Sequence, residues 1–468
     1  MWSARAPSIL PIHKCSKQSP FCGAKCRAIT RHKQLISSSE ALTGVTMIAL
    51  RSLNRPLALF LWYSAIFHVG AFGIADVVLN FYFVSLGYNS DAIGLLQGIS
   101  RVGGAFLGIP IGILADRIGM KRVVIGATLI AAISYLPLLL LPSLPVLLLS
   151  RAAFGVALSA TFIAAAPFLI ALAEREHQAH AFGYYQVTTL SMAAFGSLIG
   201  GVLPSALIAV LGLPEGAARQ GIAPAQTPFA YGGALLISAA LCLISILPVL
   251  RLPNARSAVL QSGVSVPLHA VPWRSILLLA APSLLFGLSA GLTFPFYNLF
   301  FRSRFALPDD EVGAILSLGW LMMGVVGIST PWWERRFGRL RGTIITTCLA
   351  GAAYVALGLA QAVLFAALMF VIAASVRNLL VPLYEPLRLE CVDRSLHNLS
   401  SAVGSVLWSL GWFLASTLSG LLQRNNDFTA IFISVAVLQA LTALSIALVF
   451  RKAPQAEPVA QASALASD

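Results

Sequence analysis

The chain has 468 residues, of which 58% are hydrophobic and only 10% are charged. Soluble globular domains carry about 25% charged residues. This composition, with a mean hydropathy of +0.85, therefore indicates a chain that lies mostly in lipid. The formal net charge is +14, but no soluble module interleaves a basic patch with aromatic residues. A soluble globular protein and a nucleic-acid-binding protein are therefore excluded.

The N-terminal stretch 1–46 has no sustained hydrophobic periodicity and no long apolar run. Within residues 1–50, seven Lys or Arg stand against the single acid Glu40. Two interpretations stay open: a basic targeting segment, or an upstream translation artefact with the true start at Met47. We favour the second, and we expect residues 1–50 and the C-terminal residues 453–468 to be disordered.

Twelve segments are long and apolar enough to be membrane-spanning helices, which need about 20 mostly apolar residues each. Those of the first half are 57–84, 92–115, 122–141, 144–173, 181–211 and 229–250. Those of the second half are 275–301, 312–333, 342–360, 362–388, 398–422 and 428–450. The polar, proline-rich segment 251–274 separates the two sets. We therefore predict an all-α membrane protein with six-helix bundles at 51–250 and 275–452, joined by this linker.

Basic residues predict the orientation of these helices, because cytoplasmic loops of membrane proteins are rich in Lys and Arg. With the N-terminus in the cytoplasm, the inner loops and flanks hold sixteen Lys or Arg. The outer loops then hold only four, which are Arg219, Arg302, Arg304 and Arg424. Both termini and the linker are therefore predicted to be cytoplasmic, in an integral, multi-pass protein of the plasma membrane.

The two halves repeat each other at a constant offset of 219 residues. The matches are Gly94 with Gly313, Gly119 with Gly338, Pro167 with Pro386, Glu174-Arg175 with Asp393-Arg394, and Gly201 with Gly420. The offset holds from the second span of each half to the fifth without a gap. Two copies of a hydrophobic unit in one polypeptide are typical of membrane transporters built from pseudo-symmetric halves, with the binding site between them.

The loop between the second and third spans, Gly112–Arg122, reads GILADRIGMKR. It resembles the signature of the major facilitator superfamily: a glycine, an acid–base pair, a second glycine and a basic pair. The second half carries a modified copy at Glu334–Arg341, in which Arg335 stands where the first copy has Asp116. With the span count, linker and repeat, the resemblance covers residues 50–452. It implies two six-helix bundles that work by alternating access.

In that family this loop is a latch between the two halves, and the resemblance assigns the same role here. The residues so assigned are Gly112, Asp116, Arg117, Gly119, Lys121, Arg122 and Glu174. The carboxylate of Asp116 can face the positive end of the helix that begins near Asn398. The two arginines of the loop can pair with Glu174 or Glu176 at the inner end of the fourth span. The alternative is that these charges only set the orientation and form a turn.

Two further segments resemble motifs of proton-linked members of the same family. Arg151–Gly155 (RAAFG) on the fourth span is similar to an arginine motif associated with proton-linked transport. Gly196–Gly201 (GSLIGG) on the fifth span is similar to the glycine motif of drug antiporters, although Ser197 replaces the usual proline and Met192 a usual glycine. The resemblance therefore implies a drug/proton antiporter-like protein, with export favoured over uptake.

Five ionisable residues fall at bilayer depth, where each costs at least about 2.5–3.5 kcal/mol and is a functional candidate. They are Asp76, Arg101, Arg151, Arg377 and Glu385, with His68 as a weaker candidate. At about 1.5 Å per helical residue, the first three lie about 10–15 Å below the outer ends of their spans. In the resembled family spans one, four, seven and ten line the central cavity, which places Asp76 and Arg151 on the solute path.

We hypothesise that Asp76 carries a coupling proton and that Arg151 controls its pKa, since burial and a neighbouring arginine act on a carboxyl group in opposite directions. Asn80, four residues after Asp76, shares its helix face and joins the candidate site. The alternative is a permanent bridge from Asp76 to Arg101 or Arg151 that only fixes helix packing.

Arg377 and Glu385 lie about two turns apart on the tenth span. Arg377 suits an anionic or amphipathic substrate, or it pairs with Glu385 through a water-filled cavity, or it supports packing. His68 is expected to be a hydrogen-bonded helix residue rather than a ligand. Trp408 and Trp412 share a face of the eleventh span; we expect them to pack there, and an aromatic pocket is the alternative.

Together these observations predict a secondary transporter that moves a small solute by alternating access, coupled to protons. The alternatives are a nutrient or organic-anion symporter, and a non-transporting membrane sensor or scaffold with the same fold. The sequence contains no GxGxxG or GxxxxGK[ST] loop, no metal cluster and no nucleophile triad. We therefore expect no cofactor, no metal and no enzymatic activity. The expected partners are membrane lipids, the small-molecule solute and protons, and the chain is expected to be a monomer.

Overall fold

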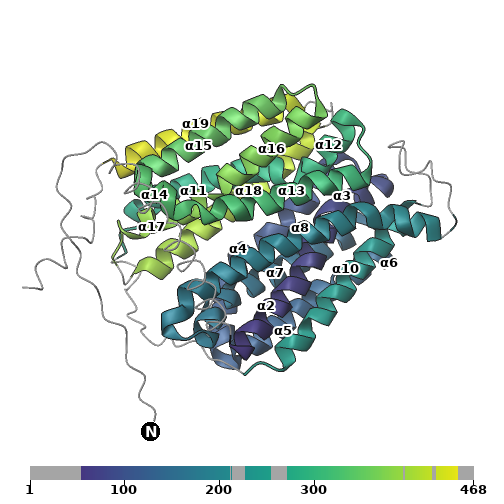
Figure 1. Cartoon of the computed structure of the whole chain (residues 1–468), viewed down its shortest axis with the longest axis horizontal. Coiled ribbons are helices and arrows are strands. Elements are labelled where there is room, and N and C mark those ends of the chain that lie inside the picture. The colour runs from purple at the N-terminus through teal and green to yellow at the C-terminus, as the bar shows by residue number, and fades with distance from the viewer. Residues whose placement is uncertain are drawn as a thin grey trace, which may run out of the picture. The chain divides into compact units, whose positions relative to one another are not determined.

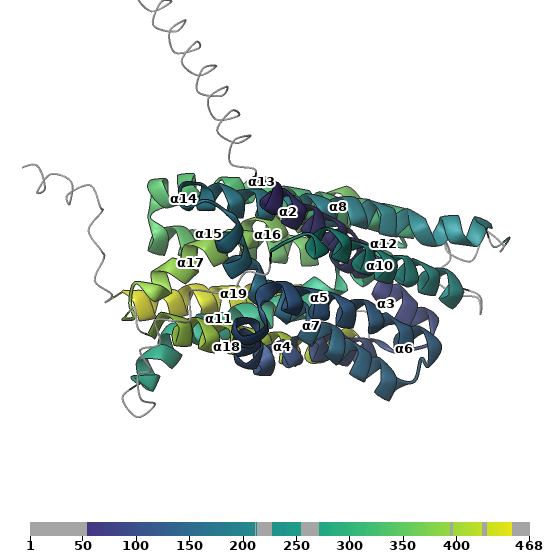
Figure 2. The ribbon, with the colours of Figure 1, turned by 90° about the horizontal axis from the view of Figure 1, so that it is seen from below.

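The computed structural model describes residues 54–210, 212, 227–253, 271–393, 396–423 and 428–451. All regular secondary structure in these residues is helical. The predicted N-terminal extension at 1–50, the tail at 453–468 and most of the linker at 251–274 lie outside them. Figures 1 and 2 show long helices packed side by side, with the first half in purple to teal and the second in green to yellow.

The first half is a set of long helical rods. The first rod is α2 (Arg55–His68), which runs through the π-helical turn η1 (Val69–Ile74) into α3 (Ala75–Ser85). The others are α4 (Ser90–Ile118), α5 (Met120–Ile133) with α6 (Tyr135–Leu140), α7 (Leu144–Leu172), α8 (Gln178–Val210) and α10 (Thr227–Leu250). The short 3-10 turn η2 (Arg175–His177) precedes α8.

The second half has the same construction. Its first rod is α11 (Trp273–Thr293), which runs through the 3-10 turn η5 (Phe294–Phe296) into α12 (Tyr297–Phe305). The others are α13 (Asp309–Ile328) with α14 (Thr330–Phe337), α15 (Arg339–Gly358), α16 (Val363–Asn378) with α17 (Leu380–Leu389), α18 (His397–Leu422) and α19 (Phe428–Phe450).

Each predicted span coincides with one of these rods to within a few residues. In the described part of the chain, eleven segments are long and apolar enough to cross a membrane. The remaining predicted span is α4, whose side chains are described only in part. Large apolar side chains also cover the outside, since Leu364, Val210 and Leu140 are 83%, 82% and 75% exposed. Such a surface suits contact with lipid, and the predicted all-α membrane fold is confirmed.

The first rods of both halves are interrupted near their middle. The π-helical turn η1 contains Gly70 and Gly73, and η5 contains Pro295, which has no backbone N–H with which to continue a helix. Irregular turns inside helices often mark functional sites, and π-helical turns do so frequently. Both interruptions contribute residues to the cavity described below.

The two halves meet where α4 packs along α18 and where α8 packs along α13 (Figure 1). At the first crossing Gly94 lies against Gly420. A Cβ atom on Gly94 would lie 2.5 Å from the backbone oxygen of Ser416, and one on Gly420 would lie 2.4 Å from that of Ser90. Small residues of this kind let helix backbones approach closely, and this crossing leaves no room for a side chain.

The second crossing reproduces the first at equivalent positions. A Cβ atom on Gly313 would lie 2.6 Å from the backbone oxygen of Ser197, and one on Gly201 would lie 2.7 Å from that of Asp309. Each of these four residues lies 219 positions from its counterpart in the first crossing. The repeat in the sequence is therefore a repeated helix contact, and both halves carry its glycines because both crossings need bare backbone.

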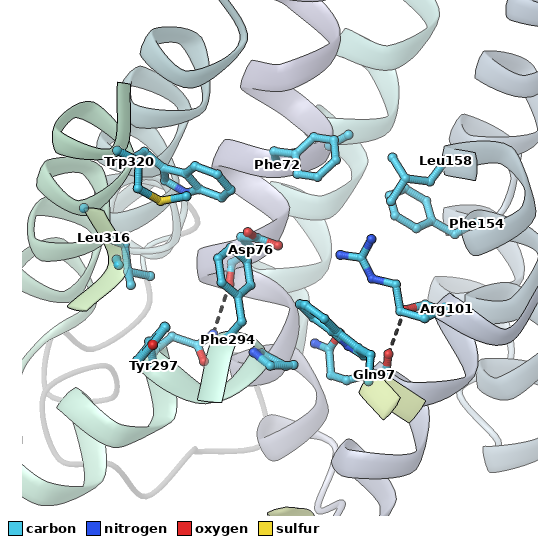
Figure 3. A pocket seen from close by; sticks show the side chains of 18 of the residues that line it. Phe72, Asp76, Gln97, Arg101, Phe154, Leu158, Phe294, Tyr297, Leu316 and Trp320 are labelled. Atoms are coloured by element: carbon cyan, nitrogen blue, oxygen red, sulfur yellow. Dashed lines mark hydrogen bonds between the residues drawn. The ribbon is translucent and has the colours of Figure 1, made fainter. Parts of the chain in front are cut away.

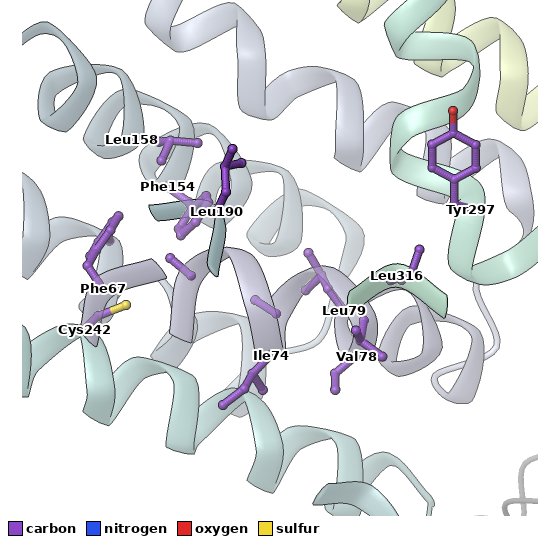
Figure 4. Close-up of a cluster of buried hydrophobic side chains, with 14 of the residues drawn as sticks. Phe67, Ile74, Val78, Leu79, Phe154, Leu158, Leu190, Cys242, Tyr297 and Leu316 are labelled. Atoms are coloured by element: carbon purple, nitrogen blue, oxygen red, sulfur yellow. The ribbon is translucent and has the colours of Figure 1, made fainter. Parts of the chain in front are cut away.

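Buried apolar side chains form a core that continues from one half into the other. Figure 4 shows part of it, with Val78 and Leu79 on α3 beside Leu316 on α13. On the first-half side, Phe154 and Leu158 of α7 belong to the same cluster. The boundary between the halves is therefore packed with apolar side chains around the cavity.

Candidate functional site

A cavity of about 870 Å³, any open solvent included, lies between the two halves. The first half lines it from η1, α3, α4 and α7, and the second half lines it from η5, α12, α13, α16 and α18. Three of the charged residues singled out from the sequence, Asp76, Arg101 and Arg151, line it together. Figure 3 shows Asp76 and Arg101 pointing into the same space from different helices.

Asp76 lies in the first turn of α3, directly after η1, and its side chain is exposed to the cavity. It attracts both arginines electrostatically, Arg101 more strongly than Arg151. Among the described residues, no salt bridge joins Asp76 to either arginine. The permanent bridge considered from the sequence is therefore not formed here, and the carboxylate is accessible from the cavity.

The position of Asp76 is set by a close contact between η1 and α8. A Cβ atom on Gly73 would lie 2.4 Å from the Cα of Gly196, and one on Gly200 would lie 2.9 Å from the Cα of Ile74. The glycines that resemble the antiporter motif do not line the cavity. Gly196 and Gly200 pack against η1, the turn just before Asp76, so they act on the site by fixing the position of that turn.

Arg101 on α4 reaches aromatic rings of α18 in the second half. Its guanidinium carbon lies 4.5 Å from the ring centroid of Trp412 and 5.6 Å from that of Trp408. Cation–π contacts stabilise a guanidinium without neutralising its charge. Trp412 lines the cavity, and its indole Nε1 is buried without a hydrogen-bond partner among the described residues. The expectation that both tryptophans only pack is therefore wrong for Trp412.

Arg151 on α7 is only 6% exposed. Its Nη2 donates to Oε1 of Gln97 at 3.2 Å, and its guanidinium carbon lies 5.0 Å from the ring of Phe154. Its Nε is buried and has no hydrogen-bond partner among the described residues. Burying a hydrogen-bond donor without a partner costs free energy, and the described surroundings of this arginine lack an acceptor for its Nε.

Gln97 starts a chain of amide hydrogen bonds that crosses from one half to the other. Its Nε2 donates to Oδ1 of Asn80 at 2.7 Å. The Nδ2 of Asn80 donates to Oδ1 of Asn298 at 2.9 Å and to the backbone oxygen of Pro295 at 2.5 Å. Asn298 donates in turn to two backbone oxygens of α3, at 3.1 and 3.0 Å. These buried amides are satisfied, and they connect Arg151 to the second half.

The repeat pairs polar cavity residues of the first half with apolar ones of the second. At the offset of 219 residues the pairs are Gln97 with Leu316, Ser100 with Gly319, Arg101 with Trp320, and Arg151 with Phe370. All eight residues line the same cavity. Equivalent positions therefore face one space from both sides, and the charged groups on them come from the first half alone.

The structure does not join Arg377 to Glu385. The guanidinium carbon of Arg377, near the end of α16, lies 5.2 Å from the ring of Phe294, a cavity residue, but Arg377 does not itself line the cavity. Glu385 on α17 accepts a hydrogen bond of 2.5 Å from Nη2 of Arg388. The pairing with Arg377 is not formed because α16 ends before Leu379, and the neighbour one turn away on α17 is nearer.

His68 and Asn80 lie behind the cavity wall rather than in it. The Nδ1 of His68 lies 2.7 Å from the backbone oxygen of Ser64, and its ring stacks on Phe72 with the centroids 4.9 Å apart. Phe72 lines the cavity. His68 is therefore a hydrogen-bonded helix residue, as expected, and it supports Phe72 from behind.

The loop between α4 and α5 is fastened to the end of α10. Gly119 turns the chain with a φ of 89°, a value that favours glycine. The Nζ of Lys121 donates to the backbone oxygens of Leu250 and Leu252, at 2.7 and 2.8 Å. A lysine beside a helix C-terminus satisfies carbonyls that lack a helical partner. The side chain of Asp116 lies outside the described part of the structure, so its predicted contact with α18 stays a prediction.

The predicted pairing of the loop arginines with the acids of the fourth span is not formed. Arg117 and Arg122 are exposed, and no salt bridge of the described residues includes either of them. Glu174 lies 3.4 Å from Nδ1 of His177 instead. Long, exposed side chains gain little from such pairing, which accounts for the difference.

The second half has the pairing that was expected of the first. Arg339 at the start of α15 bridges Glu334 of α14, at 2.6 Å, and Glu390, which follows α17. The modified signature of this half therefore still links its loop to the C-terminal end of the span that carries Arg377, despite the displaced acid.

A buried ionic cluster joins the halves near the helix ends that the sequence predicts to face outward. Arg302 on α12 forms a salt bridge with Asp309 on α13 and donates to the hydroxyl of Tyr231 on α10 at 2.9 Å. That hydroxyl donates to Oδ2 of Asp309 at 2.7 Å, and Arg302 stacks over Phe81 of α3 at 4.5 Å. The sequence placed both charges in an outer loop, but α12 and α13 extend further than predicted and bury Asp309.

Four residues that matter to the site or its surroundings were not predicted from the sequence. They are Gln97, Asn298, Trp320 and the fully buried Arg388. Burying a polar or charged group inside an apolar span costs free energy. This argument could have singled out Gln97, Asn298 and Arg388. Trp320 gives no such signal, because an aromatic residue in a span usually packs. No group of three His, Cys, Asp or Glu side chains able to hold a metal occurs in the described ranges.

Comparison with known sequences agrees with this architecture. The chain matches the Major Facilitator Superfamily over residues 61–404. It is 31% identical over 156 residues to an uncharacterized MFS-type transporter of Mycobacterium tuberculosis (strain H37Rv). That match covers 33% of this chain and 36% of the relative, so it spans about a third of the relative's length.

Solved structures share the fold at low sequence identity. A bacterial homolog of the human lysosomal transporter Spinster, inward-facing and unoccupied, aligns with a TM-score of 0.65 at 16% identity, over 85% of this chain and 96% of its own. The nucleoside transporter NupG aligns with a TM-score of 0.63 at 16% identity, over 85% and 100%. The Escherichia coli fucose:proton symporter FucP aligns at 0.56 and 15% identity, over 85% and 99%.

Proposed function

Because this chain belongs to the Major Facilitator Superfamily, whose members are transporters and not enzymes, we propose that it couples the movement of a small solute to protons through Asp76. Family membership makes it a multi-pass secondary transporter. Proton coupling is our addition. The observation that carries it is a carboxylate that forms no salt bridge within the described part of the chain, is exposed in a cavity between the halves, and is attracted by Arg101 and Arg151.

Asp76 is placed to alternate between two environments. In the present arrangement it faces the cavity and lies near two guanidinium groups; burial favours the neutral acid, and the two guanidinium groups oppose it by favouring the charged carboxylate. A rearrangement of the halves that separates Asp76 from these groups and removes water favours the neutral acid, so a proton is taken up there. Return to the first arrangement releases it.

Contacts between the halves support a cycle of alternating access. The amide chain through Asn80 and Asn298, the cluster around Arg302 and both glycine crossings lie toward the outer ends of the helices. We infer that they close the cavity on the outer side, and that opening to that side requires them to separate. The shared fold with an inward-facing Spinster homolog supports this assignment.

Export in exchange for protons is the direction that we favour. It is supported by the resemblance of Gly196–Gly201 to the glycine motif of drug antiporters, and by the contact of Gly196 and Gly200 with the turn before Asp76. We further place the chain in the plasma membrane as a monomer. We place both termini in the cytoplasm, since Lys and Arg are concentrated in the loops of that side.

Proton-coupled symport of an organic anion is the second candidate, and the arginines favour it. Arg101 and Arg151 line the cavity with only one carboxylate, and Arg377 stands behind Phe294. An anionic solute and the ionised Asp76 would compete for the same two guanidinium groups. Binding of the anion would therefore favour protonation of Asp76, and by linkage the solute and the proton would bind together.

Inverted membrane vesicles with an acidic lumen and a pH-sensitive dye distinguish these candidates. A panel of solutes is added outside the vesicles, or loaded inside them. An exchanged solute raises the lumenal pH when added outside, because protons leave as it enters. A co-transported solute raises it only when loaded inside. A chain that moves no solute in either arrangement would be a sensor or scaffold, and the transport proposal would fail.

The variant Asp76→Asn tests the carrier. We expect pH-driven transport to fall by at least about 100-fold, equal to about 2.8 kcal/mol, while exchange of solute for solute persists because it needs no net proton movement. Asp310→Asn, which changes an exposed carboxylate at the start of α13, is the matched control and should keep the wild-type rate. A pH-driven rate retained by Asp76→Asn would remove Asp76 as the proton carrier.

A further inference from the structure

The cavity has two chemically different walls. The polar wall consists of Asp76, Gln97, Arg101 and Arg151, all from the first half. The aromatic wall consists of Phe294, Trp320, Phe370 and Trp412, all from the second half. In the view of Figure 3, Trp320 and Arg101 lie on opposite sides of the Asp76 carboxylate.

The polar wall holds more positive charge than it neutralises. Arg101 rests on the Trp412 ring and Arg151 on an amide of Gln97, so both guanidinium groups have uncharged partners. Among the described residues, no carboxylate forms a salt bridge with either one. The Nε of Arg151 is buried and finds no acceptor in the ranges that the structure describes. Two arginines that share one carboxylate are therefore able to bind a further anion.

The aromatic wall offers a continuous apolar surface. The ring of Trp320 meets Phe294 edge-on at 5.5 Å and Phe72 at 6.4 Å between centroids. Phe370 packs on Tyr297 at 4.6 Å. Interlocked rings of this kind hold their shape, and they present faces on which an aliphatic or aromatic group can pack.

We infer that the solute is an amphipathic organic anion that lies across the boundary between the halves. Its anionic group binds between Arg101 and Arg151, and its apolar body packs on Trp320 and Phe370. The inference deepens the second candidate above, proton-coupled symport of an organic anion, and it rests on the proposed transport function.

Other solute classes fit the two walls less well. A cation would be attracted by Asp76 but repelled by two arginines. A polyhydroxylated neutral solute would need hydrogen-bond partners on every side, and the aromatic wall gives few, so its hydroxyl groups would be left unpaired. Only a molecule with one charged end and one apolar end satisfies both walls at once.

A matched set of probes tests this assignment on the unmodified full chain in lipid nanodiscs. The probes are 4-phenylbutyrate, its uncharged amide 4-phenylbutyramide, the cation 4-phenylbutylamine, and butyrate, which keeps the anionic group without the ring. Binding is measured by titration calorimetry. We expect 4-phenylbutyrate to bind at least about tenfold more tightly than each of the other three. Equal affinities for the anion, the amide and the cation, or a preference for the cation, would overturn the inference.

Variants assign each end of the probe to its wall. Arg101→Gln should weaken binding of 4-phenylbutyrate about tenfold and leave the amide unchanged. Trp320→Ala should weaken the anion and the amide alike and leave butyrate unchanged. Arg304→Gln, which changes an exposed arginine of α12, is the control and should change nothing. A preference for the anion that survives in both Arg101→Gln and Arg151→Gln contradicts the inference, and the probe series on the wild type decides it even if these variants do not fold.

Asp76→Asn separates this inference from the proposed coupling, because equilibrium binding needs no proton movement. We expect the variant to bind 4-phenylbutyrate more tightly than the wild type, since it removes a like charge that competes for the same two guanidinium groups. Anion binding kept together with normal pH-driven transport would refute only the carrier role of Asp76. Anion binding weakened about tenfold or more would refute the present inference.

Discussion

The two halves of this chain share their helix contacts and differ in their cavity chemistry. At the crossings, equivalent positions hold the same residue, Gly94 with Gly313 and Gly201 with Gly420. At the cavity they hold opposite chemistry, as where Arg101 corresponds to Trp320.

The difference follows from what each position must satisfy. A crossing is limited by the distance between two backbones, and that distance is the same in both halves, so both need glycine. A cavity position is limited only by the solute that both walls bind together. One wall can therefore be charged while the other is apolar. Two halves with the same helix arrangement then enclose a cavity with one charged side and one apolar side.

The glycine crossings should give the largest effect. In Gly94→Ala the new Cβ atom would lie 2.5 Å from a backbone oxygen, and in Gly313→Ala it would lie 2.6 Å from one. Overpacking of this kind costs about 1–3 kcal/mol or more. We expect both variants to shift the equilibrium away from outer closure, and by similar amounts. Distances between spin labels on α3 and α12 measure the populations.

The control for the crossings is Gly126→Ala on α5, where a Cβ atom would meet nothing within 4 Å. It should leave the populations unchanged and stabilise the helix by about 0.5–1 kcal/mol. A silent Gly313→Ala beside a strong Gly94→Ala would show that the two crossings are not equivalent in the cycle.

Replacing a charged cavity residue by its counterpart from the other half tests the difference between the walls. Arg151→Phe installs the residue found at Phe370, and it should lower the affinity for 4-phenylbutyrate at least about tenfold, or about 1.4 kcal/mol. Thermal stability should stay equal or rise, since an incompletely paired buried guanidinium is removed. Unfolding of this variant would instead make Arg151 a structural residue.

The amide chain should give a smaller effect. Gln97→Leu installs the residue found at Leu316 and breaks the link from Arg151 to Asn80. We expect outer closure to weaken by about 1–1.5 kcal/mol, read from the same label distances. The loss of closure in Gln97→Leu should not add to the loss in Asn298→Ala, because both variants cut the same chain. It should add to the loss in Arg302→Met, because Arg302 lies in a separate cluster. Full additivity with Asn298→Ala would show that the amides do not act as one chain.

The smallest effect is expected at the outer ionic cluster. Tyr231→Phe removes one hydroxyl, which donates to Asp309 and accepts from Arg302. The salt bridge between those two residues remains, so the loss should be about 0.5–1.5 kcal/mol of outer closure. A loss as large as that of Gly94→Ala would mean that this cluster, and not the helix crossings, holds the halves together.

Part of the site was predictable from the sequence because charges inside apolar spans are costly. That cost singled out Asp76, Arg101 and Arg151, and all three line the cavity. The same argument failed for Glu385, whose partner Arg388 lies one turn away on its own helix. It also failed for Arg302, because the predicted span ended at residue 301 and the next began at 312, whereas α12 continues to Phe305 and α13 already begins at Asp309.

The sequence by itself determined the helices, their division into two halves and the glycines at the crossings. These features are local, because each span must satisfy its own backbone in lipid and each crossing needs bare backbone at a fixed position in the repeat. Only the tertiary structure decided which side chains share the cavity and which partners they take. Asn80 and Asn298, which hydrogen-bond across the boundary, are 218 residues apart. Their meeting depends on helix rotation and on the interruptions η1 and η5, which hydrophobic periodicity does not encode.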